Sequence, residues 1–323
     1  MKRTVFTSLA AAVALAFGSA ASAQEDASCG SVRFVQVNWT GVSAKTETAA
    51  WMLEQLGYDT DVITASVPIM FQSLADDERD VAFGLWLPTQ RSMVREHMSE
   101  GSIDMVTANL RGAKYTLAVP RHVHEAGVQH FEDLDEHRDR FGGEIYGIEA
   151  GNDGNVVVQS MIDDDAYGLG DWELVASSEA GMLSEVKRRV PDEDWIVYLG
   201  WAPHPMNLNI DMNFLEGGAE YWGPNQGGAT VHTLTNSGYA WRCPNIGQFL
   251  ENYEYTVDEQ SKMAANVINE DMDYAEAGQA LVREKPELLD RWFAEGGAYQ
   301  TGAVKDSSGE RDALPVLREA LGL

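Results

Sequence analysis

The chain has 323 residues, of which 51 are acidic and 23 basic, so its formal net charge at pH 7 is −28. A surface this negative repels phosphate groups and anionic lipids, which excludes nucleic acid as a partner. The acidity also suits a protein that stays soluble in a saline habitat, where surface charge is screened within about 8 Å. The length exceeds what one hydrophobic core usually contains, and we therefore expect two domains.

Residues 1–23 have the pattern of an export signal. Lys2 and Arg3 precede an apolar run over residues 5–17, and Ala21-Ser22-Ala23 forms an A-x-A cleavage site. The apolar run is shorter than the roughly 18 to 20 residues of a transmembrane helix, and no later stretch reaches that length. We expect cleavage to leave a periplasmic protein with no membrane insertion. Its 51 acidic and 21 basic residues would give a formal charge of about −30.

The chain has two cysteines, Cys29 and Cys243. Because an exported protein meets an oxidising compartment, the pair most simply forms one disulfide. A redox-active role is not indicated, since no C-x-x-C spacing occurs. Residues 26–28 do not form a lipobox before Cys29, so we expect no lipid anchor.

From residue 32 the apolar pattern alternates between strand and helix periods. The first strand, helix and strand are predicted over residues 32–37, 44–56 and 59–64, with Gly57 as a helix stop. A helix, a strand and a further helix follow over residues 67–74, 81–85 and 93–99. This β-α-β succession predicts a parallel sheet covered by helices.

A second α/β set begins with a β-run over residues 114–119. Strands and helices then alternate over residues 143–148, 156–163, 172–175, 181–189 and 195–199. A segment over residues 215–222 and a Gly-rich loop over 223–228 precede a β-run that ends at residue 235. Helices are predicted over residues 248–253, 257–269, 274–284, 286–294 and 314–321. No linker separates the two sets, so we predict an α/β fold in which domain II, residues 114–217, is inserted into domain I, residues 24–113 and 218–323.

Two stretches share one pattern, an apolar strand that leads into Gly, Trp and Pro. Residues 81–89 read Val-Ala-Phe-Gly-Leu-Trp-Leu-Pro-Thr, and residues 197–205 read Val-Tyr-Leu-Gly-Trp-Ala-Pro-His-Pro. Trp86 and Trp201 thus stand where a strand gives way to a loop, the place where open α/β sheets bind ligands. One interpretation is that they are two walls of one pocket; the other is that each is a core tryptophan.

The sequence lacks the motifs of common catalytic and metal sites: G-x-S-x-G, the P-loop, H-E-x-x-H, paired C-x-x-C and the EF-hand loop. His122 and His124 have the spacing of a metal pair without a nearby cysteine, so we expect a surface feature and no metal. The acidic clusters at residues 76–78 and 163–165 are expected at helix ends or in loops. His204 is the one tempting general base, but no Ser or Cys is placed to be its partner. We therefore expect no enzymatic activity and no cofactor.

Aromatic residues gather at the predicted strand ends: Trp39 after the first strand, Trp86, Tyr115 and Trp201. A quaternary ammonium has no N–H to donate and spreads its charge over methyl groups, so the faces of Trp and Tyr suit it. Each ring contributes about 0.5 to 2 kcal/mol beyond apolar burial. Three or four rings could therefore reach the roughly −8 kcal/mol of micromolar binding.

Six segments carry a family resemblance: residues 38–40, 85–88, 112–115, 146–155, 199–206 and 223–232. Through them nearly the whole mature chain resembles the periplasmic choline and glycine betaine substrate-binding proteins of ABC transporters, most closely the choline-binding type. The resemblance implies a two-lobed periplasmic binding protein fold, each lobe a mainly parallel sheet flanked by helices, with the ligand in the interdomain cleft. It also implies a monomer that delivers its ligand to an ABC transporter permease.

The resemblance also implies roles for single residues. Trp39, Trp86, Tyr115 and Trp201 would form the ammonium box, Asn152 would hydrogen-bond the polar tail of the ligand, and Cys29 would pair with Cys243.

Gly41 departs from the choline-type pattern, in which an aspartate two residues after the first box tryptophan accepts the ligand hydroxyl. Without that carboxylate the chain loses a hydrogen bond to choline and also a repulsion toward the carboxylate of glycine betaine. Choline and glycine betaine both stay open as ligands, as do trimethylamine N-oxide and dimethylsulfoniopropionate. An enzyme acting on choline esters is the alternative from another class.

Overall fold

The structure is a computed structural model that describes residues 27–299 and 302–323. The predicted signal peptide, residues 1–23, lies outside the described residues. Within them, no helix has both the length and the apolar character that crossing a membrane requires.

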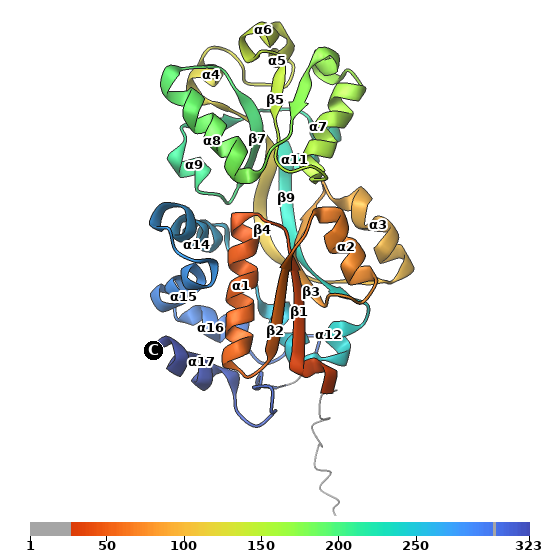
Figure 1. Cartoon of the computed structure of the whole chain (residues 1–323), viewed down its shortest axis with the longest axis vertical. Helices are drawn as coiled ribbons and strands as arrows, with labels where there is room; N and C mark the ends of the chain where they lie inside the picture. Colours follow the sequence, from red (N-terminus) through yellow and green to blue (C-terminus); the bar gives the residue numbers. More distant parts are fainter. Residues whose placement is uncertain (1–26, 300–301) are drawn as a thin grey trace, which may run out of the picture.

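The first lobe, at the bottom of Figure 1, is built on three parallel strands with helices on both sides. Its strands are β1 (Ser31–Gln36), β2 (Asp59–Thr64) and β3 (Val81–Leu87). Its helices are α1 (Thr40–Gln55), α2 (Val67–Ala75), α3 (Arg91–Glu100), α12 (Tyr239–Arg242), α13 (Pro244–Asn252), α14 (Val257–Glu270), α15 (Tyr274–Glu284), α16 (Glu287–Trp292) and α17 (Ala313–Leu321), after the 3₁₀ turn η1 (Ala27–Gly30). The predicted elements of this lobe are all present.

The second lobe, at the top of Figure 1, contains parallel strands β5, β6 and β7. The strands of this part are β5 (Glu144–Tyr146), β6 (Glu173–Val175), β7 (Val197–Ala202) and β8 (Met212–Phe214). The helices are α4 (Arg121–Glu125), α5 (Asp133–Glu136), α6 (Arg138–Phe141), α7 (Asp153–Asp163), α8 (Glu179–Arg189), α9 (Met206–Asn209), α10 (Ala219–Trp222) and α11 (Pro224–Gly227), with 3₁₀ turns η2 (Ala166–Asp171) and η3 (Val190–Asp192). The acidic cluster at residues 163–165 lies at the end of α7, and the cluster at residues 76–78 directly follows α2, as predicted.

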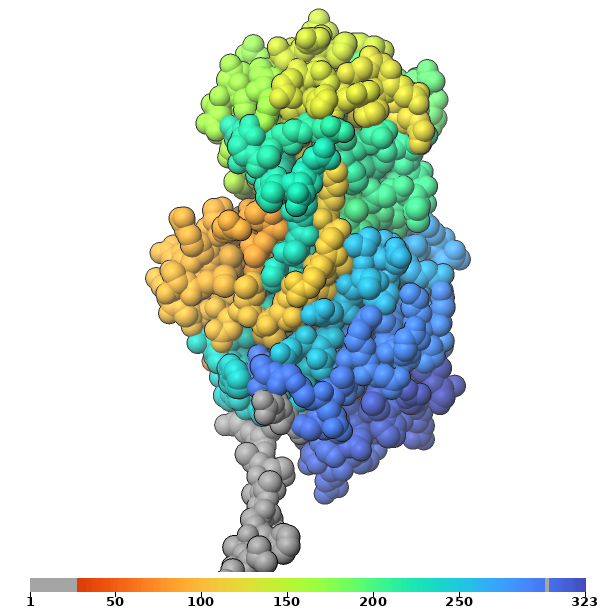
Figure 2. Space-filling view, turned by 180° about the vertical axis from the view of Figure 1, so that it is seen from behind, coloured from red at the N-terminus to blue at the C-terminus, as the bar shows by residue number. Residues whose placement is uncertain are grey.

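Two antiparallel strands, β4 (Ile103–Pro120) and β9 (Gly228–Asn236), join the lobes and cross the waist of the molecule in Figure 2. They make one continuous sheet of order β2-β1-β3-β9-β4-β7-β5-β6, with β8 beside β4. The predicted two-lobed α/β fold class is confirmed. The domain division at residues 113/114 falls inside β4, and the division at residues 217/218 comes before α10 and α11, which lie with the second lobe (Figure 1). The domain boundaries stay a proposal.

Strand β4 begins at Ile103, whereas the sequence predicts a strand only from Lys114. Its pairing with β9 shifts register at three places before residue 114, and Gly112 has a φ of +77°. Each shift interrupts the two-residue alternation by which a strand is recognised in a sequence.

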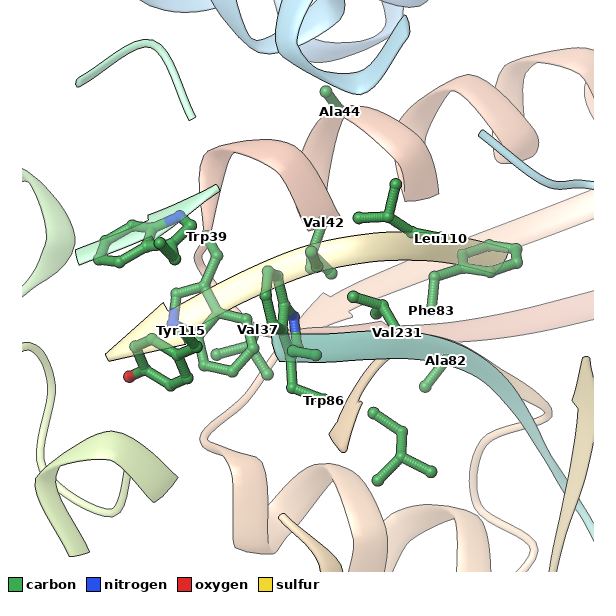
Figure 3. Close-up of a cluster of buried hydrophobic side chains, with 14 of the residues drawn as sticks. Val37, Trp39, Val42, Ala44, Ala82, Phe83, Trp86, Leu110, Tyr115 and Val231 are labelled. Atoms are coloured by element: carbon green, nitrogen blue, oxygen red, sulfur yellow. The ribbon is translucent and has the colours of Figure 1, made fainter. Parts of the chain in front are cut away.

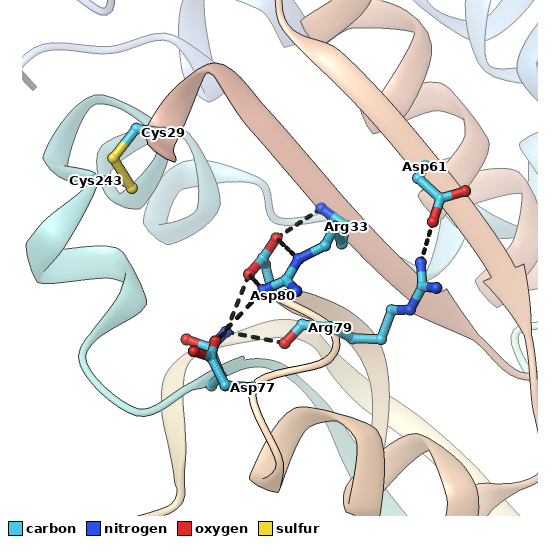
Figure 4. A network of polar contacts seen from close by, with 8 residues as sticks. Cys29, Arg33, Asp61, Asp77, Arg79, Asp80 and Cys243 are labelled. Carbon is cyan, nitrogen blue, oxygen red and sulfur yellow. Dashed lines mark hydrogen bonds and ion pairs between the residues drawn. A yellow bond between two sulfur atoms is a disulfide. The ribbon is translucent and has the colours of Figure 1, made fainter. Parts of the chain in front are cut away.

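A disulfide and a buried carboxylate link segments at the far end of the first lobe, away from the second lobe (Figure 4). Cys29 and Cys243 are bonded, with Cα atoms 5.5 Å apart, which confirms the predicted pair. Asp80 accepts hydrogen bonds from the backbone N of Arg33 at 2.8 Å and from Nδ2 of Asn236 at 3.0 Å. These bonds tie β1 and the end of β9 to the turn before β3.

Candidate ligand-binding site

Trp86 and Trp201 occupy equivalent places, each the last residue but one of its strand, β3 and β7. The peptide bonds Leu87–Pro88 and Ala202–Pro203, directly after them, are both cis. Both indoles therefore lie at the change from strand to loop, as the repeated sequence pattern predicts.

Tyr115 lies between these two tryptophans. It pairs with Trp201 across the antiparallel strands β4 and β7, and the ring centroids are 6.2 Å apart. Its ring is also 5.9 Å from that of Trp86, with an edge-to-face tilt of 63°. Figure 3 shows Trp86, Tyr115 and Trp39 together at one end of a cluster of buried side chains. Three strand ends thus bring the aromatic residues into one place.

Trp39 caps the N-terminus of α1, directly after β1, and its indole is fixed by a carboxylate of the other lobe. Its Nε1 donates to Oε1 of Glu149 at 2.8 Å. Burial raises the pKa of Glu149, while the indole N–H favours its ionised form. The Trp39 ring is therefore held by its polar edge, which leaves its faces for apolar or cationic contacts.

Asn152 is the N-cap of α7, and its side-chain oxygen is fully used. Oδ1 accepts hydrogen bonds from the backbone N of Gly154 at 2.8 Å, from the backbone N of Asn155 at 3.2 Å and from the Tyr115 hydroxyl at 2.9 Å. The amide nitrogen Nδ2 also donates to Oδ1 of Asp153 at 3.3 Å, so Asn152 has no acceptor and only one N–H left to offer a ligand.

The six residues predicted to bind ligand line one cavity between the lobes. The cavity holds about 400 Å³ of space outside protein atoms, part of it open to solvent. Its lining comprises Trp39, Gly41, Val42, Trp86, Tyr115, Ile148, Asn152, Trp201, Pro203 and Gln260. The four aromatic residues are only 5 to 7% exposed and also belong to the hydrophobic core. The pocket-wall and core interpretations of the tryptophans therefore both describe part of their environment.

The family comparison agrees with this arrangement. Residues 30–284 match the OpuAC family, described as the substrate binding domain of the ABC-type glycine betaine transport system. The chain belongs to this family. It is an extracytoplasmic substrate-binding protein of a glycine betaine/choline-type ABC transporter.

Solved structures similar to this substrate-binding protein include an ABC-transporter choline binding protein in complex with choline, with a TM-score of 0.85. A second similar structure, an ABC-transporter choline binding protein in unliganded semi-closed conformation, has a TM-score of 0.79. Each is 40% identical to this protein and covers 92% of this chain and 100% of its own. An uncharacterized protein, ORF1 of Chromohalobacter salexigens, is 47% identical over 127 residues, which are 39% of this chain and 82% of that protein.

Carboxylates of the second lobe bind the first lobe beside the cavity of the substrate-binding protein. Besides Glu149, Asp153 accepts from Nε2 of Gln90 at 3.1 Å. Glu179 accepts from the backbone N of Thr40 at 3.2 Å and from its hydroxyl at 2.5 Å. These bonds cross from lobe to lobe, so the two lobes are closed onto one another beside the cavity.

Two of the side chains next to the cavity have shifted acidities. Burial raises the pKa of Asp153 to about 6, so this carboxyl is mostly ionised at neutral pH. Burial also raises the pKa of Tyr115 well above its usual value, and the nearby charges of Asp153 and Glu149 act in the same direction. The Tyr115 ring is therefore neutral, with negative charge behind it.

His204, the tempting general base, is 3% exposed and has a partner at each ring nitrogen. Its Nδ1 accepts the backbone N–H of Met206 at 3.0 Å, so Nε2 carries the proton and donates to Oε1 of Glu179 at 3.2 Å. The ring also packs 5.0 Å from that of Trp201. These contacts give His204 a structural role behind the cavity wall.

The two histidines that have the spacing of a metal pair lie away from the cavity. His122 and His124 are part of the short helix α4. Throughout residues 27–299 and 302–323, His, Cys, Asp and Glu side chains form no group of three that could hold a metal ion.

Sequence reasoning missed two aromatic or amide side chains at the site. Trp222 is fully enclosed and packs 5.5 Å behind the ring of Tyr115. Gln260, on α14, lines the cavity although it is far from every other lining residue in the sequence. The apolar pattern of the sequence can predict that Gln260 lies in a helix, but it does not indicate that this helix packs beside the cavity.

Proposed function

We propose that this substrate-binding protein captures a quaternary ammonium compound, choline or glycine betaine, in an aromatic box and delivers it to the permease of an ABC importer. The ammonium head would lie among Trp39, Trp86, Tyr115 and Trp201, held by cation–π contacts. The proposal includes no enzymatic step, and it treats the protein as a periplasmic monomer.

One observation carries the proposal: four aromatic rings line a cavity to which no lining residue contributes a charged side chain. A primary ammonium would need hydrogen-bond acceptors around its nitrogen, whereas a quaternary ammonium needs only ring faces and apolar surface. Val42, Ile148 and Pro203 add such apolar surface. The cavity therefore fits a methylated cation better than an amine.

Charge beyond the lining supports the same ligand class. The carboxyls of Asp153 and Glu149 lie behind Asn152 and Trp39, where they contact the polar groups of these side chains and not the cavity itself. Their negative potential favours a cation in the cavity without offering it a hydrogen-bond partner.

Calorimetry on refolded, ligand-free protein tests the ligand class. Choline, glycine betaine, trimethylamine N-oxide and dimethylsulfoniopropionate share a methylated onium head and differ in their tails. We expect micromolar or tighter binding of at least one of them, because three or four rings supply roughly −8 kcal/mol. Absence of binding by all four compounds would contradict the proposal.

Trp201→Ala tests the box itself, with Trp241→Ala as its matched control. Trp201 lines the cavity, whereas Trp241 is 64% exposed on the first lobe. We expect Trp201→Ala to weaken onium binding by about tenfold or more, from the loss of one ring contact together with its apolar area. Trp241→Ala should bind as the unaltered protein does.

The enzyme alternative has its own test. Incubation with choline esters should yield no hydrolysis above the spontaneous rate, since His204 is hydrogen-bonded at both nitrogens. Turnover that disappears in His204→Gln would favour the alternative.

A further inference from the structure

The polar side chain of Gln260 is buried at the cavity wall, where its amide oxygen makes no hydrogen bond to the described part of the protein. Gln260 is 2% exposed, and this oxygen is Oε1. A buried amide oxygen without a partner is unfavourable, so its presence at a cavity wall calls for an explanation, and a ligand group that donates to it is one.

The position of Gln260 is fixed by the start of α14. Thr256 and Glu259 form a capping box, and Glu259 also binds Nη2 of Arg291 at 2.6 Å. The backbone N of Gln260 donates to the carbonyl of Thr256 at 3.1 Å. The helix start is thus anchored away from the cavity, and only the side chain of Gln260 reaches it.

Gly41 provides the space that this amide occupies. A Cβ atom at position 41 would lie 2.8 Å from Nε2 of Gln260 and 3.6 Å from its Cδ. Gly41 is the second residue of α1 and has no left-handed φ, so its backbone does not require glycine. Any side chain at position 41 would therefore displace the amide of Gln260.

The cavity also needs an acceptor that Asn152 does not supply. Oδ1 of Asn152 already accepts three hydrogen bonds and Nδ2 donates to Asp153, which leaves one N–H and no acceptor for a ligand. A ligand hydroxyl needs a hydrogen-bond acceptor, and Oε1 of Gln260, which has no partner in the described part of the chain, can be that acceptor.

We propose that Gln260, in the space left by Gly41, recognises the polar tail of the ligand opposite Asn152 and sets the tail specificity of the site. This inference rests on the proposed function. The oxygen of an amide side chain accepts a hydrogen bond from a hydroxyl. After the amide group rotates, its N–H groups donate hydrogen bonds to a carboxylate. The site therefore accommodates a ligand with either a hydroxyl or a carboxylate tail. A carboxylate side chain in place of the amide would repel a carboxylate tail.

Calorimetry with three probes tests the role of Gln260: tetramethylammonium, which has no tail, choline and glycine betaine. Gln260→Glu keeps the shape and adds a carboxylate, so the ratio of the glycine betaine Kd to the choline Kd should rise by about tenfold or more. Gln55→Glu adds the same charge at the exposed end of α1 and should leave that ratio unchanged.

Gln260→Leu and Gly41→Ala complete the test. In Gln260→Leu, choline and glycine betaine should each weaken by about tenfold while tetramethylammonium keeps its affinity. The melting temperature of the ligand-free variant should not fall, because a buried amide oxygen without a hydrogen-bond partner is replaced by an apolar group. Gly41→Ala should reproduce this loss of tail recognition, whereas Gly30→Ala, with no atom within 4 Å of the added methyl, should change nothing.

The outcomes separate this inference from the proposed function. If tetramethylammonium binds the unaltered protein but Gln260→Leu and Gln260→Glu leave the relative affinities of the three probes unchanged, Gln260 does not recognise the tail and only this inference is overturned. If none of the probes binds the unaltered protein, the proposed function fails, and tail recognition by Gln260 fails with it.

Discussion

Gly154, the second residue of α7, lies against the hydroxyl end of the Tyr115 side chain. A Cβ atom there would be 2.0 Å from the Tyr115 hydroxyl oxygen and 2.6 Å from Cζ. Gly154→Ala should therefore push Tyr115 away and weaken onium binding by about tenfold or more, even though alanine favours a helix by about 1 kcal/mol. Calorimetry measures this effect.

Tyr115→Phe is the comparison for Gly154→Ala. It keeps the ring in place and removes only the hydrogen bond to Asn152, so its effect on tetramethylammonium binding should be smaller. Equal losses in the two variants would show that the hydroxyl matters and the ring position does not.

Lys45 is completely buried in α1, with its Nζ 2.5 Å from Oδ1 of Asn109 and 5.2 Å from the ring centre of Tyr255. Burial lowers its pKa from 10.5 to about 7. Above pH 7 the folded state has lost this proton while the unfolded state keeps it up to about pH 10, so stability from this group rises with pH in that window.

Urea unfolding at pH 7 and pH 9.5 measures the contribution of Lys45. The free energy of unfolding of the unaltered protein should rise by the order of 3 kcal/mol relative to that of Lys45→Met, which lacks the titrating group. Lys262→Met, at a position paired with Glu284 near the surface, should behave as the unaltered protein does. A Lys45→Met profile parallel to that of the unaltered protein would show that Lys45 does not titrate in this range.

At the scale of elements, α10 and β7 contribute tryptophans with different tasks. Trp222, from α10, is 0% exposed and does not line the cavity, whereas Trp201, from β7, does. Trp222→Ala should lower the free energy of unfolding by about 3 to 5 kcal/mol, the usual cost of truncating an enclosed tryptophan.

Paired denaturation and binding measurements compare Trp222→Ala with Trp201→Ala. The Trp201 variant should lose more affinity and less stability than the Trp222 variant, because its ring faces the cavity on one side. The opposite order would assign Trp201 to the core and Trp222 to the ligand.

At the scale of the whole molecule, three pairs join the two lobes beside the cavity: Trp39 with Glu149, Thr40 with Glu179, and Gln90 with Asp153. None of these pairs survives if the lobes separate. A ligand that contacts both lobes adds interactions only in the closed arrangement, and it therefore shifts the population toward closure.

Small-angle X-ray scattering tests closure. The radius of gyration should decrease when choline or glycine betaine saturates the unaltered protein, and Trp201→Ala should need a higher concentration of the same ligand for the same decrease. A constant radius for the unaltered protein at saturation would contradict a cavity shared by two lobes.

Much of the fold was predictable because patterns of apolar residues and of helix stops along the chain indicate single helices and strands. The helix at residues 274–284 and the strand at residues 59–64 have the predicted bounds. The helix follows its apolar period, and the strand is marked by Gly57, which ends the helix before it. The early half of β4 was not predictable, because three register shifts break its alternation. That β4 and β9 join both lobes into one sheet depends on pairing between distant segments, which no local period contains.

The candidate site divides in the same way. The sequence alone determined that Trp86 and Trp201 end their strands, and its family resemblance led to Asn152 and the disulfide pair. Only the tertiary structure decided that Asn152 has no acceptor left and that Gln260 fills the space above Gly41. The physical reason is that these properties belong to contacts between α1, α7 and α14, and the sequence records what each helix buries but not which side chain it meets.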